Sequence, residues 1–407
     1  MDSCGSLAGS LLDLASAIYA AGTSLVCGSV APETVQLGPR RYQVARQLGE
    51  GGFSQVLLVE EVDSGAQYAL KKIICHQGTD ALAMAQREID AGMRFAHPNI
   101  VPLVDHGIVD GGPSLRGTQI AYMVFPVYRR GSMFDLVMDS EDGGRRLDEQ
   151  FVIRVFRGVC AAVRYLHSYS DGGSRGRSEG GRRSDADASL KSVDLAGSED
   201  DGRQGAQFLG PSKQHWQPTS PGRAGGYAEL PQAEERDAAA TLSPERARTG
   251  GYAHRDIKLG NVMLADDGKT PILMDFGSVR PARATARTRA EALQMQDDAA
   301  ENCTMPYRAP ELFDVQRDAE IDERTDVWSL GCLLFAMAFG YTPFEGPGMG
   351  PGTSIALAAI NAKYTFPASS PHSDRIKQLV DFMLVPDPRQ RPFVDQVIAL
   401  TDQLYPH

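Results

Sequence analysis

The sequence predicts an α+β protein of two lobes, a small antiparallel β-rich lobe followed by a larger, mainly helical one. Residues 42–74 alternate between apolar and polar side chains and are rich in Val, Leu and Tyr, as strands are. An apolar stripe at helical spacing runs through residues 152–166. Once the unpatterned residues 1–39 and 168–250 are set aside, about 285 of the 407 residues remain, enough for a compact two-lobed unit.

The strands of the first lobe are interrupted by a glycine-rich stretch at residues 49–52, and strand patterns follow at residues 56–62 and 68–73. Residues 80–95 place four apolar side chains at helical spacing, namely Leu82, Ala85, Ile89 and Met93. The stripe of the second lobe is stronger, and it consists of Val152, Val155, Phe156, Val159, Cys160, Val163 and Leu166. We therefore expect a helix in each of these two segments.

Composition excludes several classes of protein. The chain has 42% hydrophobic and 23% charged residues, and its net charge of −11 argues against a nucleic-acid partner. No apolar run reaches the roughly 18–20 residues of a membrane span, and residues 1–39 lack the Lys and Arg of a secretory or transit signal. The six cysteines show no paired spacing and no CxxC motif, as in reduced intracellular thiols. We expect a cytoplasmic protein, with peripheral membrane contact at most.

Residues 168–250 are dominated by Gly, Ser, Ala, Arg and Asp, with charges of both signs interspersed. Such a segment buries too little apolar surface to offset the entropy lost on ordering. We expect a disordered surface insertion. Its Arg-Gly pieces, such as residues 175–177, also occur in segments that bind RNA, but the mixed charge favours a solvated linker.

The stretch GYAHRDIKLGNVML at residues 251–264 carries polar groups suited to chemistry. Asp256 follows a His-Arg pair, Asn261 stands five residues later, and Asp275 opens an Asp-Phe-Gly sequence behind the apolar residues 272–274. On neighbouring strands of a hairpin, Asn261 and Asp275 would offer oxygen ligands to a hard cation. Mg²⁺ usually binds through one or two such protein oxygens together with substrate phosphates, so the pattern predicts a phosphate site nearby.

A phosphate site is predicted upstream, in LGEGGFSQV at residues 48–56, where glycines between two strands allow a close backbone approach. A dinucleotide-binding site would need a third glycine, where Ser54 stands, and a following helix, where a strand pattern follows. Lys71 lies in an apolar strand and needs a partner, for which Glu88 on the next helix is the candidate. The alternative for Glu88 is a solvated helix face, where glutamates are common.

These motifs, in this order, resemble the eukaryotic protein kinases over about residues 42–405 apart from the insertion. The resemblance implies a two-lobed protein kinase fold and Mg²⁺-dependent transfer of the ATP γ-phosphate to Ser or Thr hydroxyls of protein substrates. The catalytic residues it implies are Asp256, which accepts the hydroxyl proton, Lys258 at the γ-phosphate, and the pair Lys71–Glu88 at the α/β-phosphates. Asn261 and Asp275 would hold Mg²⁺.

The resemblance also implies a nucleotide site, with a gatekeeper at Phe125 and a hinge near residues 126–128. The glycine-rich loop would cover the triphosphate with Leu48, Gly49, Glu50, Gly51, Gly52, Phe53 and Ser54. Further contacts to ATP would come from Val56, Ala69, Lys71, Phe125, Val127 and Met263. Ser54 departs from the usual third glycine, so we expect a less flexible loop that still binds ATP.

Structural roles follow from the same resemblance. Glu311, in an Ala-Pro-Glu sequence, is expected to pair with Arg391, and Asp326 is expected to brace the catalytic loop. His254 is expected to pack inside the core without transferring protons.

Longer stretches resemble the Numb-associated kinase family more closely, among them HPNI at residues 97–100, CTMPYRAPELF at 303–313 and IDERTDVWSLGC at 321–332. RTRAEALQMQDDAAE, at residues 287–301, matches the additional helix of that family's activation segment. The resemblance implies autophosphorylation and a role in membrane trafficking or signalling. A catalytically silent scaffold that binds nucleotide is the alternative, and the intact catalytic set argues against it.

The N-terminal segment bears on membrane contact. A lipid-anchored branch of that family needs glycine after Met1, and because Asp2 stands there we expect no myristate. Residues 27–42 nevertheless resemble the cysteine-bearing leader of that branch, which makes Cys27 and Cys4 candidates for acylation on Golgi or other endomembranes. An apolar stripe in the leader fits a helix on a membrane surface and a poorly ordered leader equally well, and it consists of Leu7, Leu11, Leu14 and Ile18.

The expected organisation has five parts. These are a leader at residues 1–39, a first lobe at 40–127, the start of the second lobe at 128–167, the insertion at 168–250, and the rest of the second lobe at 251–407.

Overall fold

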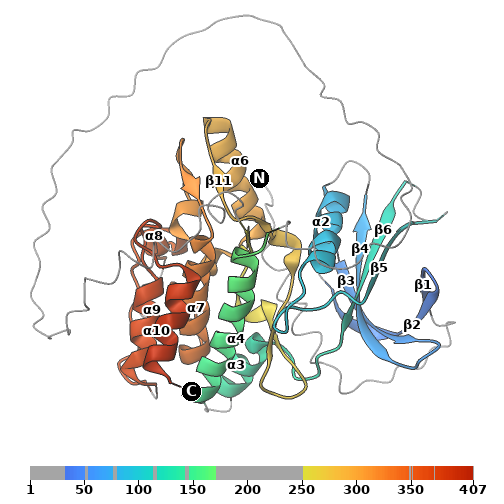
Figure 1. Ribbon diagram of the computed structural model, residues 1–407, viewed down its shortest axis with the longest axis horizontal. Coiled ribbons are helices and arrows are strands. Elements are labelled where there is room, and N and C mark those ends of the chain that lie inside the picture. The colour runs from blue at the N-terminus through green and yellow to red at the C-terminus, as the bar shows by residue number, and fades with distance from the viewer. Residues whose placement is uncertain are drawn as a thin grey trace, which may run out of the picture. The chain divides into compact units, whose positions relative to one another are not determined.

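The structure is a computed structural model (Figure 1) that describes residues 33–50, 54–76, 80–112, 117–142, 146–170, 251–347, 350, 352–370 and 372–406. The chain divides into two units, residues 1–170 with 245–407 and residues 171–244, and every described residue belongs to the first. Within this unit the predicted α+β architecture of two lobes is confirmed.

The first lobe is built on a six-stranded antiparallel sheet with the strand order β1-β2-β3-β4-β6-β5. The three strands predicted within residues 42–74 are present as β2, β3 and β4. The bounds of the six strands are β1 Thr34–Leu37, β2 Arg40–Glu50, β3 Ser54–Glu61, β4 Gln67–Cys75, β5 Asp105–Asp110 and β6 Gln119–Pro126.

Strand β6 is buried on both faces, and its alternating side chains separate two apolar clusters. Tyr122 and Val124 pack with side chains of β1 to β4 on one face. Ala121 and Met123 point to the other face and pack against helix α2 (Ala81–Arg94), which lies along the sheet in Figure 1. The period of two thus fixes which strand residues meet α2.

The predicted face of α2 is correct at Ala85 and Ile89, which are buried, and wrong at Met93, which is 57% exposed. The helix turns Gly92 toward the protein instead, where an added Cβ would lie 3.0 Å from the Cβ of Leu103. Because successive residues are about 100° apart around a helix, Met93 then points outward. The close approach at Gly92 therefore decides the orientation of the last turn.

The second lobe is mainly helical, and two long helices form its centre. All seven apolar residues of the predicted stripe are buried in α4 (Glu149–His167). The residue before this helix, Asp148, caps it, because its side chain accepts a hydrogen bond from the Phe151 amide. Helix α7 (Arg324–Phe339) is buried from Thr325 to Phe339. The remaining helices are α3 Met133–Asp142, α6 Arg289–Asn302, α8 Ile355–Ile360, α9 Asp374–Met383 and α10 Val394–Leu404.

The chain between α4 and α7 forms short two-stranded sheets. Strands β8 and β9 form a hairpin, β7 pairs with β10, and β11 pairs with β12. Helix α6 confirms the additional helix expected at residues 287–301. The bounds are β7 Tyr252–Ala253, β8 Val262–Leu264, β9 Pro271–Leu273, β10 Arg280–Pro281, β11 Ala284–Thr285 and β12 Glu320–Ile321.

Two expected boundaries differ from the structure. The sequence pattern places residues 34–37 in the leader, but they form the edge strand β1 and bury Val35 and Leu37. Four residues are too few for a period of two to be recognised. The insertion was expected from residue 168, but Ser168 caps α4 and Tyr169 packs against Phe95, with ring centroids 5.1 Å apart. The leader residues 1–32 and the insertion residues 171–250 lie outside the described part of the chain, as do Cys4 and Cys27.

The chain leaves and re-enters the described part at one place. A Cβ added to Gly251 would lie 2.1 Å from the carbonyl oxygen of His167, and the rings of Tyr169 and Tyr252 are 6.1 Å apart. The residues that flank the insertion are therefore in direct contact.

We predict that deleting residues 171–248 leaves the fold intact. Each halving of a flexible loop lowers its closure cost by about 0.6 kcal/mol, so the deletion should keep or raise the melting temperature. Thermal unfolding of the deletion variant and the full chain measures this. A clear fall in the melting temperature would show that residues 171–248 contribute to the folded unit.

Candidate active site

The predicted pair of Lys71 and Glu88 is present and buried. Lys71 Nζ on β4 donates to Glu88 Oε1 and Oε2 on α2 at 2.7 and 2.8 Å, and it lies 3.7 Å from Asp275 Oδ1. Lys71 and Glu88 are only 8% and 7% exposed. A buried charge without a partner is costly, so the ion pair ties the position of α2 to that of β4 and Asp275.

The carboxylates keep Lys71 charged. Burial alone would lower the pKa of Lys71, but Glu88 and Asp275 outweigh it and raise that pKa above its ordinary value. Burial likewise opposes ionisation of Asp275, yet Lys71 and then Lys258 hold the pKa of Asp275 below its usual range. The site therefore presents a fixed ammonium group beside an ionised carboxylate.

The carboxylate of Asp256, in the loop between β7 and β8, accepts hydrogen bonds from several side chains. Lys258 Nζ lies 2.9 Å from Asp256 Oδ2, and Asn261 Nδ2 donates to the same oxygen at 3.0 Å. The other oxygen, Oδ1, accepts from the amide and the hydroxyl of Thr304 at 2.9 and 2.6 Å. Lys258 Nζ also donates to Thr304 Oγ1 at 2.9 Å, so the three side chains form a closed cluster around Asp256.

Asp326 on α7 braces this loop, as expected. The fully buried carboxylate accepts from the amides of His254 and Arg255 at 2.7 and 2.8 Å, and His167 Nε2 lies 2.9 Å from it. Arg255 has a φ of 69°, which is uncommon for a residue with a side chain, and the two amide bonds hold it there. Burial opposes ionisation of Asp326, but the bond to His167 lowers its pKa.

The β8–β9 hairpin brings Asn261 and Asp275 to adjacent positions. Asn261 precedes β8, Asp275 follows β9 by two residues, and the Met274 amide donates to the Asn261 carbonyl at 2.9 Å. Asn261 uses its side-chain nitrogen on Asp256, which leaves the amide oxygen for other partners. One carboxylate and one amide oxygen are the hard ligands that Mg²⁺ accepts together with phosphate oxygens, so the donor set fits the ion.

An apolar pocket lies beside these groups, against the sheet and α2. Four residues expected at the nucleotide line it: Val56, Ala69, Lys71 and Phe125. Leu48, Val127 and Met263 pack in the same apolar cluster without lining the pocket. The other lining residues are Glu88, Gly92, Val101, Pro126, Met274, Asp275 and Phe276.

The glycine-rich loop is described only at its two ends. Gly49 and Glu50 end β2, Ser54 begins β3, and the pairing of these strands shifts register between Gln47 and Gly49. Gly51, Gly52 and Phe53 lie outside the described residues.

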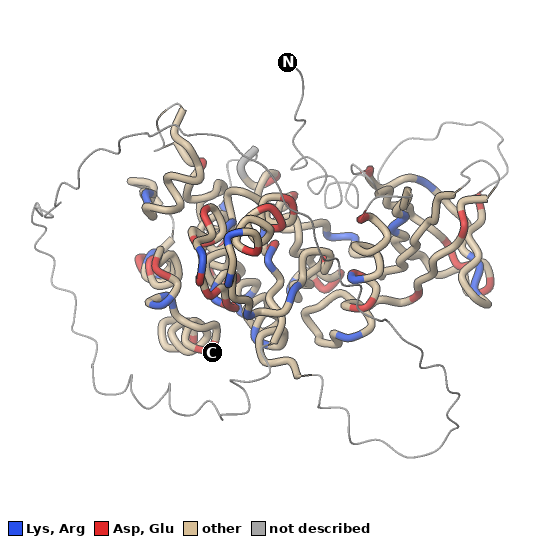
Figure 2. The backbone as a smooth tube through the Cα atoms, turned by 90° about the horizontal axis from the view of Figure 1, so that it is seen from above, with Lys and Arg blue, Asp and Glu red and all other residues tan. Residues whose placement is uncertain are grey.

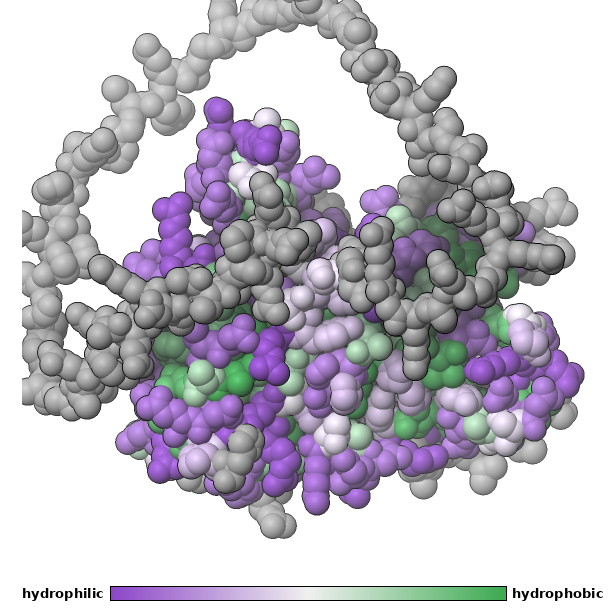
Figure 3. Space-filling model, in the orientation of Figure 1, coloured by the Kyte–Doolittle hydropathy of each residue, from purple (hydrophilic) through white to green (hydrophobic). Residues whose placement is uncertain are grey.

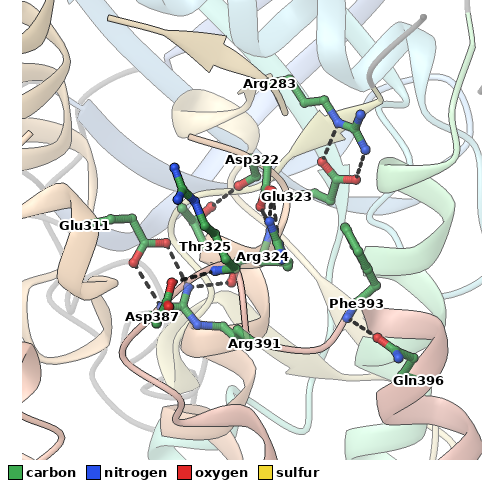
Figure 4. A network of polar contacts seen from close by, with 11 residues as sticks. Arg283, Glu311, Asp322, Glu323, Arg324, Thr325, Asp387, Arg391, Phe393 and Gln396 are labelled. Atoms are coloured by element: carbon green, nitrogen blue, oxygen red, sulfur yellow. Dashed lines mark hydrogen bonds and ion pairs between the residues drawn. The ribbon is translucent and has the colours of Figure 1, made fainter. Parts of the chain in front are cut away.

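Two further structural expectations are met, the pairing of Glu311 with Arg391 and the packing of His254 inside the core. Glu311 and Arg391 form a double contact of 2.8 and 2.9 Å, drawn in Figure 4. Arg391 also donates to the carbonyl of Arg324 at the start of α7, so it links the Ala-Pro-Glu segment to that helix. His254 is fully buried, and its ring contacts Phe276 at 5.3 Å.

The sequence did not single out Thr304, Gly92 or Val101. Thr304 could have been found from its place just before the Ala-Pro-Glu segment, because that segment returns to the catalytic loop. Gly92 and Val101 give no sequence signal of a pocket. Gly92 lines the pocket because α2 packs closely against Leu103. Val101 lines it because the preceding residue, Ile100, forms a β-bridge with Leu273.

Comparison with known proteins agrees with this geometry. The protein kinase domain family matches residues 42–170 and 249–401. The chain belongs to the protein kinase family. Its fold is accordingly the two-lobed protein kinase fold, with the match interrupted where the insertion was expected.

Relatives from distant organisms are similar along almost the whole chain. Serine/threonine-protein kinase 16 of Homo sapiens is 32% identical over 373 residues, which cover 92% of this chain and 93% of that protein. Serine/threonine-protein kinase ppk13 of Schizosaccharomyces pombe is 30% identical over 91% of this chain and 92% of its own. Serine/threonine-protein kinase ENV7 of Saccharomyces cerevisiae is 29% identical over 93% and 96%.

The similarity to serine/threonine-protein kinase 16 confirms the narrower resemblance, to the myristoylated and palmitoylated member of the Numb-associated kinase family. The protein is a serine/threonine protein kinase, and a silent scaffold is not favoured. Membership of this family implies ATP, a divalent metal and protein substrates.

We predict that Lys71→Met lowers turnover by roughly 100-fold or more, because it removes a preorganised positive charge from the phosphates. It also leaves two buried carboxylates without their cation, so the melting temperature should fall. The double variant Lys71→Met/Glu88→Gln should recover stability without recovering turnover. Kinase assays with labelled ATP and thermal unfolding measure both effects.

Lys72→Met is the matched control, since the neighbouring lysine points away from the site and lies 3.0 Å from Glu33. Equal turnover of the Lys71 and Lys72 variants would refute the assignment of Lys71 to the phosphates.

Proposed function

We propose that the protein transfers the γ-phosphate of ATP to Ser and Thr hydroxyls through a site centred on Asp256, with Mg²⁺ as the metal. The observation that carries this proposal is the convergence of Lys258, Asn261 and Thr304 on the Asp256 carboxylate. Four donors hold that carboxylate in one orientation, as a group that must meet an incoming hydroxyl requires.

Asp256 orients the attacking hydroxyl and accepts its proton. The Thr304 hydroxyl donates to Asp256 Oδ1 at 2.6 Å and so occupies one side of this carboxylate. Lys258 bridges Asp256 and Thr304 and supplies positive charge for the transferred phosphate. These contacts bring together the segment with Asp256 and Lys258, which precedes α6, and the segment with Thr304, which follows it. They support a reaction site formed by both segments.

The phosphates of ATP are held from the first lobe. Lys71 binds the α/β-phosphates while Glu88 fixes its position. The triphosphate is covered by the glycine-rich loop, which consists of Leu48, Gly49, Glu50, Gly51, Gly52, Phe53 and Ser54. Five apolar side chains surround the adenine: Val56, Ala69, Phe125, Val127 and Met263. This proposal is supported by their packing, because all five belong to one apolar cluster or pack against it.

Asn261 and Asp275 hold the metal through their side-chain oxygens. Mg²⁺, when bound there, neutralises negative charge on the phosphate oxygens. The lowered pKa of Asp275 supports this role, because a carboxylate binds a metal ion in its ionised form.

We further propose peripheral contact with Golgi or other endomembranes through acylation of Cys27 and Cys4, together with autophosphorylation and a role in trafficking or signalling. The support is the cysteine-bearing leader at residues 27–42 and the similarity to serine/threonine-protein kinase 16. None of the helices in the described part of the chain has the length and apolar character of a membrane span.

Nucleic acid is not among the proposed partners. The net charge of −11 is unfavourable for a polyanion, and Asp and Glu occur among Lys and Arg in both lobes in Figure 2.

We predict different defects for two aspartates. Asp256→Asn should keep ATP binding and slow phosphoryl transfer by about 10²–10⁴-fold, since it removes the proton acceptor and leaves the nucleotide contacts of the first lobe in place. Asp275→Asn should weaken Mg²⁺-dependent ATP binding and turnover together. Fluorescence titration with a nucleotide analogue and single-turnover kinetics separate the two effects.

Asp139→Asn, on the exposed side of α3, is the control and should behave as wild type. Wild-type turnover in both active-site variants would overturn the proposed mechanism.

We predict that Cys27→Ser releases most of the protein from membranes, because a single remaining acyl chain gives only marginal, reversible binding. Fractionation of cells that express the full chain, with and without hydroxylamine treatment to cleave thioesters, measures this, and Cys4→Ser is the comparison. A wild-type protein found only in the soluble fraction, or one without a thioester-linked lipid, would contradict the proposal.

A further inference from the structure

Helix α6 has little apolar surface with which to hold its place. Only Ala292 and Ala299 of its 14 residues are buried, and most of the face visible in Figure 3 is hydrophilic. Helices in proteins usually depend on packing of an apolar face. The position of α6 therefore depends on polar contacts as well as on this small apolar face.

The first end is closed by local contacts. The Thr288 hydroxyl accepts from the Glu291 amide at 3.1 Å, and the Glu291 carboxylate accepts from the Thr288 amide at 3.1 Å. This capping box fixes where the helix begins but does not attach it to the active site.

The last turn is attached to the segment that follows Asp275. Ser278 Oγ donates to the carbonyl of Asn302 at 2.7 Å. Asp298 Oδ1 lies 2.9 Å from an Nη of Arg280, and it also accepts from Asn302 Nδ2 at 3.0 Å. Two separate contacts thus join the last turn of α6 to residues 278–280.

Arg280 extends this attachment back toward Asp275. Its second Nη donates to the carbonyls of Gly277 and Val279 at 3.1 and 3.0 Å. One guanidinium therefore fixes both the turn after Asp275 and the distance of that turn from α6. Asp275 itself has a φ of 62°, so its backbone needs such support.

A second cation lies near the same carboxylate. Burial and, next, the positive charge of Arg280 lower the pKa of Arg87 on α2, while Asp298 acts in the opposite direction. Arg87 directly precedes Glu88, the partner of Lys71. The charge of Asp298 thus acts on Arg87 as well as on Arg280, and Arg280 is its ion-pair partner.

We propose that Asp298 is a positioning residue, which through Arg280 holds Asp275 in the arrangement that binds metal and nucleotide. This inference rests on the proposed function of Asp275. Asp298 lies in the additional helix expected at residues 287–301, outside the motifs that supply the expected catalytic, nucleotide and metal residues. Its side chain is 37% exposed, so its pair with Arg280 contributes little to global stability, and its effect should appear in the reaction instead.

The test compares Asp298→Asn, Asp298→Glu and Asp297→Asn in the full chain, each dephosphorylated beforehand. Asp297 is the matched control, because it is exposed and lies one position earlier on the same helix. Asp298→Asn should lower kcat/KM for ATP about tenfold and leave KM for a peptide substrate unchanged. Asp298→Glu should restore at least half of the loss, and the melting temperatures should agree within about 3 °C.

Three results would overturn the proposal: wild-type kinetics of Asp298→Asn, an equal defect in Asp297→Asn, or a rise confined to the KM for peptide. Asp256→Asn and Asp275→Asn are measured in the same assay. If these two keep their turnover, the proposed site is wrong; if they lose it while Asp298→Asn does not, only the role of Asp298 is wrong.

Discussion

The buried ammonium group of Lys71 is the contact on which the arrangement of the first lobe depends. It joins β4, α2 and the segment at Asp275, three parts of the chain that are far apart in sequence. Removing water from a charge is costly, and only well-placed partners offset the cost. Movement of α2 away from the sheet would break the Lys71–Glu88 pair and leave Asp275 as the partner of Lys71, so the ion pair favours the position of α2 seen here.

Apolar packing and polar contacts have different effects in this protein. Burial of an apolar side chain such as Leu70, which is 0% exposed, contributes about 1.5–3 kcal/mol and has no direction. A buried ion pair contributes little net energy, but it is directional. The apolar clusters therefore account for most of the stability, whereas Lys71–Glu88 and Glu311–Arg391 determine which segments meet.

Sequence patterns predicted what depends on local periodicity. The stripe of α4 and the strands β2 to β4 follow from spacing alone, and the polar motifs indicate Lys71, Glu88, Asp256 and Asp275. Features that depend on tertiary contacts were missed. Met93 fits the spacing of α2 but points outward, since the approach to Leu103 at Gly92 decides the orientation of the helix.

Strand β1 and Thr304 were missed for other reasons. Residues 34–37 show a period of two over only four residues, and they become a strand because β2 offers an edge to pair with. Thr304 is polar, ordinary in its spacing and remote from Asp256 in sequence, and only the path of the chain after α6 brings its hydroxyl to the carboxylate. A local window of sequence holds no signal for the strand, and Thr304 is indicated only by its place shortly before the Ala-Pro-Glu segment.

The position of the insertion follows from how the catalytic loop is held. His167, the last residue of α4, and the amide of His254, at the start of the catalytic loop, both meet Asp326 Oδ2, at 2.9 and 2.7 Å. One buried carboxylate on α7 thus anchors the chain on both sides of residues 171–250. Because the loop is fixed by α7 and not by the chain that leads into it, the length of that chain has no direct way to alter the position of Asp256. This anchoring explains why a long insertion and an intact catalytic loop occur next to each other in one sequence.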